Sequence, residues 1–180
     1  MKILYVYDAL CGWCYGFSPV ITEFVDRHNL DYEVVSSGMI TGDRIGPIGK
    51  VAPYIKQAYK EVEERCGVTF GTDFLDVLDE GSMVFTSIQA AVAMSVFKEQ
   101  GDGDELAFAK AEQEQIYYHG KAPGEAETFA TLATQHGCDK EAFLRAMQDE
   151  AYLQKAHADF QLSQQLQVSG FPTVFLVQGQ

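Results

Sequence analysis

The sequence predicts an α/β fold in which a small sheet domain is interrupted by a long helical block. The chain opens with two short runs rich in β-branched and aromatic residues, and a helical pattern lies between them. A third run of that kind follows near the C-terminus, after a long stretch of helical patterning. Apolar residues make up 47% of the 180 positions, which is typical of a globular protein with one sizeable core.

The N-terminal part of the chain is expected to form a strand–helix–strand unit. The first strand is predicted in KILYVYD, residues 2–8, and the second in DYEVVSSG, residues 31–38. Between them, apolar residues recur at helical spacing from 13 to 28, and Pro19 is expected to kink that helix. A right-handed crossover makes the two strands parallel neighbours in one sheet.

The helical block and the final strand complete the predicted order. Capping residues and terminal glycines favour helices over residues 86–101, 104–120 and 127–137. A short helix is also expected over 53–65, and the pattern from 139 to about 167 is long enough for two helices. FPTVFLVQ, residues 171–178, is strand again, with Pro172 at its entrance. We therefore assign residues 1–52 and 168–180 to a discontinuous α/β domain and residues 53–167 to an inserted helical domain.

Charge and targeting signals restrict the partners. The chain carries 26 Asp and Glu against 13 Lys and Arg, a net charge of −13, which disfavours nucleic acid and anionic membrane surfaces. No apolar run is long enough for a transmembrane helix. The first residues faintly resemble a signal peptide, but Asp8 interrupts them and no small-residue cleavage site follows. A cytoplasmic protein is therefore expected.

Two of the four cysteines, Cys11 and Cys14, form a C-x-x-C pair in DALCGWCYGF. A zinc site needs four ligands, and Cys66, Cys138 and four scattered histidines supply no second pair with the usual spacing. A structural disulfide would close a loop too short to stabilise the fold much. A redox-active pair needs the first cysteine exposed at a helix N-terminus and the second one turn inside, and the predicted strand–helix junction provides this.

A helix N-terminus would favour the thiolate of Cys11 through the helix dipole and through free backbone N–H groups. Stabilising that thiolate makes the disulfide form a stronger oxidant, so Gly12 and Trp13 lie where they can tune the redox potential. Trp13 is the only tryptophan of the chain. We expect its side chain to cover the disulfide and to contact substrates.

DALCGWCYGF, the helical insertion and VSGFPTVF together resemble the DsbA-type thiol–disulfide oxidoreductases, in particular their FrnE-like branch of protein-disulfide isomerases. The resemblance covers nearly the whole chain and implies a thioredoxin fold with an inserted helical domain. It implies Cys11 as the attacking nucleophile, Cys14 as the resolving thiol and Pro172 as a cis-proline facing the disulfide. Phe171 would then offer its backbone and its ring to a substrate. No cofactor and no metal are implied.

The chain departs from that pattern at three points. Thioredoxin relatives often carry a buried acid six residues before the first cysteine, where this chain has Tyr5. Asp8 is the nearest acid and can serve either as the proton acceptor or as a cap of the strand end. The Gly12–Trp13 dipeptide lacks the His of strong oxidants and the Pro of thioredoxin, which leaves the direction of electron flow open. The family fold continues past the proline strand, so the C-terminal part is expected to be incomplete at Gln180.

We therefore expect a thiol–disulfide oxidoreductase or isomerase that exchanges electrons with protein substrates or with low-molecular-weight thiols such as glutathione. Two alternatives stay open. One is a glutathione-dependent transferase or isomerase of the kappa type, although such sites usually place Ser at the first position. The other is a zinc-binding interaction module.

Overall fold

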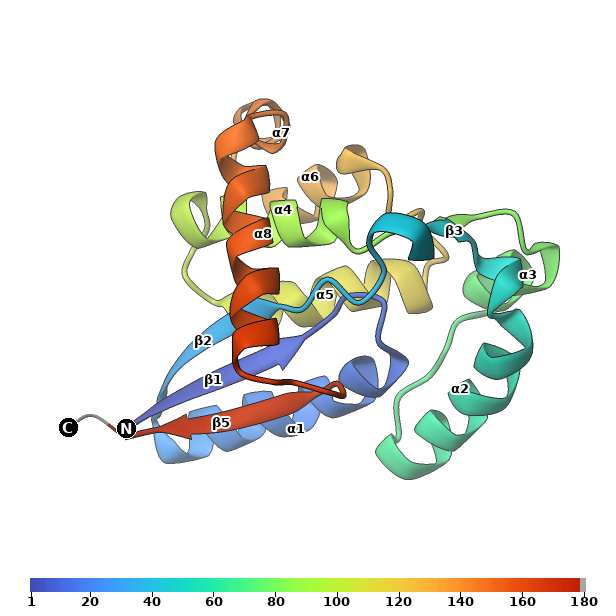
Figure 1. Cartoon of the computed structure of the whole chain (residues 1–180), viewed down its shortest axis with the longest axis horizontal. Helices are drawn as coiled ribbons and strands as arrows, with labels where there is room; N and C mark the ends of the chain where they lie inside the picture. Colours follow the sequence, from blue (N-terminus) through green and yellow to red (C-terminus); the bar gives the residue numbers. More distant parts are fainter. Residues whose placement is uncertain (179–180) are drawn as a thin grey trace.

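A three-stranded sheet with the order β2–β1–β5 carries the N-terminal and C-terminal parts of the chain in a computed structural model that describes residues 1–178 (Figure 1). The central strand β1, Lys2–Tyr7, pairs in parallel with β2, Asp31–Ser36, and in antiparallel with β5, Thr173–Val177. The predicted parallel pairing of the first two strands is confirmed. Residues 179–180 of the α/β domain expected from the sequence lie outside the described residues.

Eight α-helices are described, and α1 joins β1 to β2. Their bounds are α1 Gly12–His28, α2 Ala52–Cys66, α3 Thr72–Glu80, α4 Ile88–Gln100, α5 Glu105–Tyr117, α6 Ala126–Thr134, α7 Lys140–Met147 and α8 Glu150–Gln165. The predicted pair of helices after residue 139 is confirmed as α7 and α8. Helix α1 continues without a break through Pro19.

Helix α3 and a small second sheet were not predicted. That sheet pairs β3, Gly46–Pro47, with β4, Val84–Phe85, and short 3₁₀ turns lie at Gly42–Arg44 and Ile48–Lys50. Strands of two residues are too short to show an alternating pattern, so the sequence carries no signal for them. The chain then enters α2, and the helix expected over residues 53–65 is confirmed there.

Charged side chains of the helical block close the outer edge of β2. The backbone N–H of Val34 donates to the Glu105 carboxylate at 2.9 Å, and the Lys98 ammonium donates to the Val34 carbonyl at 2.5 Å. Farther along the strand, the N–H of Ser36 donates to Asp159 at 3.1 Å. These contacts come from α5, α4 and α8, so three helices satisfy edge groups that would otherwise be open to another strand. They also fix the helical block against the sheet.

None of the helices in residues 1–178 combines the length and apolar character that crossing a bilayer requires.

Candidate active site

Cys11 is the N-cap residue of α1. Its backbone is extended, and its sulfur accepts a hydrogen bond from the backbone N–H of Cys14 at 3.2 Å. An N-cap acceptor satisfies one of the N–H groups that a helix start leaves free. Cys14 lies one turn inside the helix and is fully buried. The strand–helix junction therefore places the two sulfurs as the sequence predicts, the first at the helix N-terminus and the second behind it.

The expectation that Cys11 is exposed is wrong. Only 5% of Cys11 is exposed, because the loop before β5 covers it from one side and helix α2 from the other. Both cysteines are free thiols in this structure. Cys11 is therefore reached through a pocket rather than from an open surface.

Burial raises the pKa of the Cys14 thiol well above its usual value. The neighbouring Cys11 adds to that rise, and a hydrogen bond from the Asp8 backbone partly offsets it. A thiol that is buried and protonated is a poor nucleophile until its proton is lost. The two cysteines of the pair thus have different environments, and Cys11 is the one that borders the pocket.

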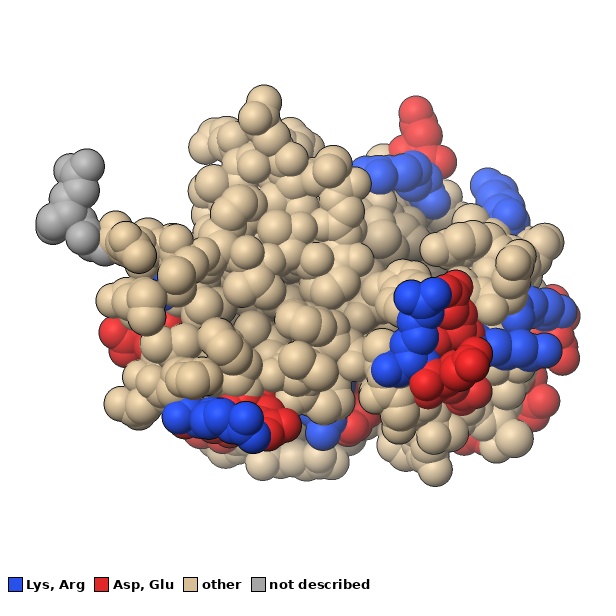
Figure 2. Space-filling view, turned by 90° about the horizontal axis from the view of Figure 1, so that it is seen from below, with Lys and Arg blue, Asp and Glu red and all other residues tan. Residues whose placement is uncertain are grey.

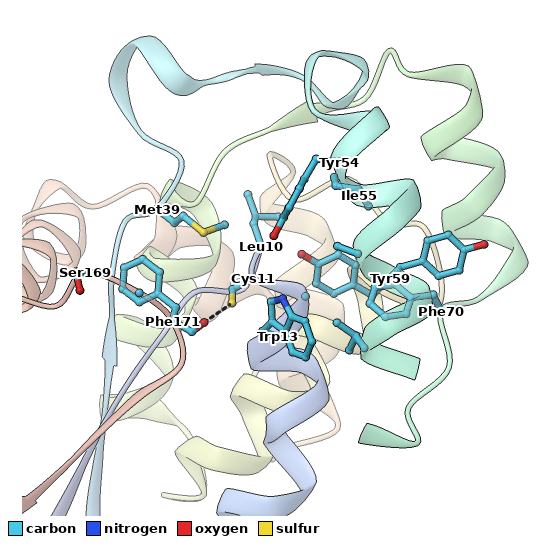
Figure 3. Close-up of a pocket in the computed structure, with 15 residues that line it drawn as sticks. Leu10, Cys11, Trp13, Met39, Tyr54, Ile55, Tyr59, Phe70, Ser169 and Phe171 are labelled. Atoms are coloured by element: carbon cyan, nitrogen blue, oxygen red, sulfur yellow. Dashed lines mark hydrogen bonds between the residues drawn. The ribbon is translucent and has the colours of Figure 1, made fainter. Parts of the chain in front are cut away.

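The loop before β5 brings Phe171 to the first cysteine. The Cys11 thiol donates to the Phe171 carbonyl oxygen at 3.6 Å, across 160 positions of sequence (Figure 3). The Phe171–Pro172 peptide bond is cis, and both residues are half-buried. Once the Cys11 sulfur has no proton, the Phe171 carbonyl loses this donor and can accept a hydrogen bond from another N–H group.

A pocket of about 350 Å³ opens beside the Cys11 sulfur. Figure 3 shows Cys11 between Phe171 on one side and the aromatic side chains of α2 on the other, with Trp13 next to it. None of the lining residues carries a charge; they are Leu10, Cys11, Gly12, Trp13, Met39, Tyr54, Ile55, Ala58, Tyr59, Val62, Phe70, Tyr117, Ser169, Gly170 and Phe171. Such a wall favours apolar or aromatic groups beside a reacting sulfur.

Much of that wall was missed by the sequence analysis. One face of α2 supplies Tyr54, Ile55 and Tyr59, and Phe70 comes from the segment after it. The helical spacing of the α2 residues was a usable signal for one apolar face. The sequence offered no signal that this face turns toward Cys11, because that depends on how the insertion packs on α1.

Asp8 is buried, and its carboxylate accepts four hydrogen bonds. The donors are the N–H groups of Leu10 and Met39 and the hydroxyls of Ser37 and Ser87, at 2.7 to 3.1 Å. Burial raises the pKa of Asp8, and all four hydrogen bonds act against that rise. The carboxylate thus joins the end of β1 to the loop after β2 and to the start of α4.

Glu112 is a second buried acid near the site, and no sequence motif indicates it. Its carboxylate accepts from the Tyr7 hydroxyl at 2.6 Å, and its other oxygen has no hydrogen-bond partner among residues 1–178. Burial raises the pKa of Glu112 well above its usual value, and the Tyr7 hydrogen bond lowers it only in part. The next residue, Gln113, donates to the Asp8 backbone carbonyl at 3.2 Å.

Within residues 1–178, no three His, Cys, Asp or Glu side chains gather in an arrangement that would hold a metal ion.

Comparison with known proteins gives one family. The model of a DSBA-like thioredoxin domain matches residues 2–180. No curated protein matches the sequence. Among solved structures, the cytosolic disulfide reductase DsbM from Pseudomonas aeruginosa is 29% identical, with a TM-score of 0.86, and the match covers 99% of this chain and 85% of that one.

Two further structures are similar. The same DsbM with GSH matches with a TM-score of 0.84 at 29% identity, over 98% of this chain and 86% of that one. A candidate protein disulfide isomerase from Nitrosomonas europaea has a TM-score of 0.87 at 22% identity, over 99% of this chain and 85% of that one. The latter similarity concerns the fold alone.

Proposed function

The chain belongs to the DSBA-like thioredoxin domain family, a mixed α/β fold with a helical insertion, and from this premise we propose that it exchanges disulfides through Cys11 and Cys14. The observation that carries the proposal is the unequal placement of the two sulfurs. Cys11 caps α1 at the mouth of an uncharged pocket, and Cys14 lies buried one turn behind it. The motifs CGWC and GFPT favour the FrnE-like, disulfide-isomerase branch of the family.

The proposed reaction has two displacements. The Cys11 thiolate attacks one sulfur of a substrate disulfide, a mixed disulfide forms, and the other substrate sulfur leaves as a thiolate. Cys14 then loses its proton and attacks the Cys11 sulfur, which forms the Cys11–Cys14 disulfide and releases the second substrate thiolate. The substrate is reduced by two electrons and the protein is oxidised by two. In the reverse direction, the same two steps oxidise a substrate dithiol to a disulfide.

The supporting residues have separate proposed roles. Trp13 and Gly12 border the pocket and would contact the group that carries the substrate sulfur. Phe171 would bind the backbone of the substrate beside Pro172. Asp8 is proposed as a positioning residue rather than as the base. Its four hydrogen bonds hold the strand end and the loop after β2, and proton uptake by the carboxylate would weaken them.

The proposed partners are protein disulfides and low-molecular-weight thiols, with glutathione as one electron donor. A structure of the similar DsbM contains GSH, and that protein is named a cytosolic disulfide reductase. We therefore propose the cytoplasm as the compartment and reduction of substrate disulfides as the main direction.

The test is a comparison of two single variants on a non-reducing gel. Cys14→Ser should accumulate a covalent mixed disulfide with an added protein disulfide, since attack by Cys11 still occurs and resolution does not. Cys11→Ser should accumulate almost none and lose activity. A Cys66→Ser, Cys138→Ser double variant serves as the matched control and should keep its activity. Equal trapping by both single variants, or an inactive control, would contradict the assignment of roles.

A further inference from the structure

The Tyr5 hydroxyl is a buried polar group without a hydrogen-bond partner. Tyr5 lies in the central strand β1 with 1% of its surface exposed, and among residues 1–178 nothing pairs with its oxygen. Tyr7, two residues along the same strand, is equally buried, but its hydroxyl donates to Glu112. Buried hydroxyls are nearly always paired, so the difference between the two tyrosines calls for a reason.

Packing fixes the Tyr5 ring on the same side of α1 as Cys14. The ring stacks on Tyr7 with centroids 5.7 Å apart and lies 6.1 Å from the ring of Phe17. Phe17 follows Cys14 by three positions in α1, and residues at that spacing share one helix face. The aromatic ring that carries the unpaired hydroxyl is therefore held against the face of α1 that presents the Cys14 sulfur.

The ionisation of Tyr5 agrees with this placement. Burial raises the pKa of Tyr5 well above its usual value, and interactions with the Cys14 and Cys11 thiols raise it further. The phenol thus stays protonated at neutral pH and can donate a hydrogen bond. In the dithiol form the hydroxyl and the Cys14 sulfur are close neighbours without a well-formed hydrogen bond.

We propose that the Tyr5 hydroxyl donates a hydrogen bond to the Cys14 sulfur while Cys14 resolves the mixed disulfide. The inference rests on the exchange reaction proposed above and assigns it a further residue. Cys14 gives its proton to solvent, its thiolate attacks the Cys11 sulfur, and the substrate leaves as a thiolate, while Tyr5 keeps its own proton throughout. A donor aimed at a buried thiolate stabilises the charge that burial otherwise disfavours.

The experiment separates the two displacements with 5,5′-dithiobis(2-nitrobenzoate), a disulfide whose released thiolate is coloured. In a Cys66→Ser, Cys138→Ser parent, attack by Cys11 releases the first coloured thiolate, and resolution by Cys14 releases the second. Tyr5→Phe should slow the second release about tenfold at neutral pH and leave the first unchanged, because one hydrogen bond to a charged atom is lost. The pH profile of the second release should move to higher pH.

Tyr7→Phe in the same parent is the matched control, because it removes a hydroxyl from the neighbouring ring of the same strand. It should leave both releases close to the parent rates. Urea unfolding should find Tyr5→Phe at least as stable as the parent, since the hydroxyl removed has no partner. If Tyr5→Phe releases both coloured thiolates at the parent rates, or slows both releases equally, the proposed role of Tyr5 is overturned and the exchange function is not. A parent without a second release would overturn the exchange function as well.

Discussion

At the scale of single residues, Glu112 is the most unusual acid of the molecule. It is fully buried in α5, one carboxylate oxygen accepts from Tyr7, and the other oxygen has no partner among the described residues. Asp8 lies close enough to raise the pKa of Glu112 further. The carboxyl therefore stays protonated in the folded protein at pH values where it is ionised in the unfolded chain.

That difference predicts how stability changes with pH. An unfolded Glu loses its proton near 4.5, whereas the folded protein keeps it, so the folded state binds more protons above that pH. The stability that protonated Glu112 contributes is complete below the pKa of this residue in the unfolded chain. It is lost as the pH rises toward the pKa of Glu112 in the folded protein. Relative to Glu112→Gln, the free energy of unfolding of the parent should fall by up to about 1.4 kcal/mol per pH unit. Urea unfolding of both proteins at several pH values measures this, and a difference independent of pH would contradict it.

The sequence predicted some site residues well and others not at all. Cys11, Cys14, Trp13 and Phe171 belong to short motifs, and the structure brings all four together. The burial of Cys11 was missed, because the wall that covers it comes from distant parts of the chain. Glu112 was missed for a similar reason: a charged residue within a helical pattern predicts an exposed position, and α5 is surrounded by other helices.

At the scale of elements, the approach of α2 to α1 determines the shape of the pocket. A Cβ atom on Gly16 would lie 2.8 Å from the Cys66 sulfur and 2.8 Å from a Val62 methyl group. Only a glycine allows this contact between the two helices. The helical insertion thus supplies one wall of the site through a close contact with the helix that carries the cysteines.

Gly16→Ala should therefore force the two helices apart. We expect a loss of about 1–3 kcal/mol in the free energy of unfolding, the usual cost of overpacking, and partial recovery when Val62→Ala is added. Gly12→Ala is the control, because its Cβ would meet Phe70 at 3.6 Å, an ordinary contact. Urea unfolding of Gly16→Ala, of Gly16→Ala with Val62→Ala and of Gly12→Ala measures these free energies. Equal stabilities of the Gly16 and Gly12 variants would show that the helix contact is looser than described.

Side-chain caps mark the starts of two helices that the sequence predicts. Asp104 and Asp139 cap α5 and α7 by accepting from the N–H groups of Ala107 and Ala142, at 2.9 and 2.8 Å, and both helices were expected at those starts. Helix α3 begins after Gly71 without a side-chain cap, and it was missed. Side-chain caps therefore account for the predicted starts of α5 and α7 but not for every prediction, because α2, α4 and α6 also begin without a side-chain cap and were expected.

At the scale of the whole molecule, the order of elements predicted the fold class, but the site depends on contacts far apart in sequence. Cys11 meets Phe171 because β5, which follows the helical block in sequence, pairs with β1. The chain carries a net charge of −13, and on the face shown in Figure 2 Lys and Arg lie beside Asp and Glu in small groups, next to a broad uncharged area. The lining of the pocket carries no charged side chain, which favours apolar or aromatic groups in a bound partner.

Above all, we propose that Cys11 and Cys14 form a reversible redox pair. The most direct measurement is an equilibrium titration of the protein in glutathione buffers, with the disulfide located by mass spectrometry. We predict a two-electron transition in which the only disulfide joins Cys11 and Cys14, with a potential nearer the ~−270 mV of thioredoxin than the ~−120 mV of the strongest oxidants. Thiols that stay reduced across the whole range, or a disulfide that involves Cys66 or Cys138, would contradict the account.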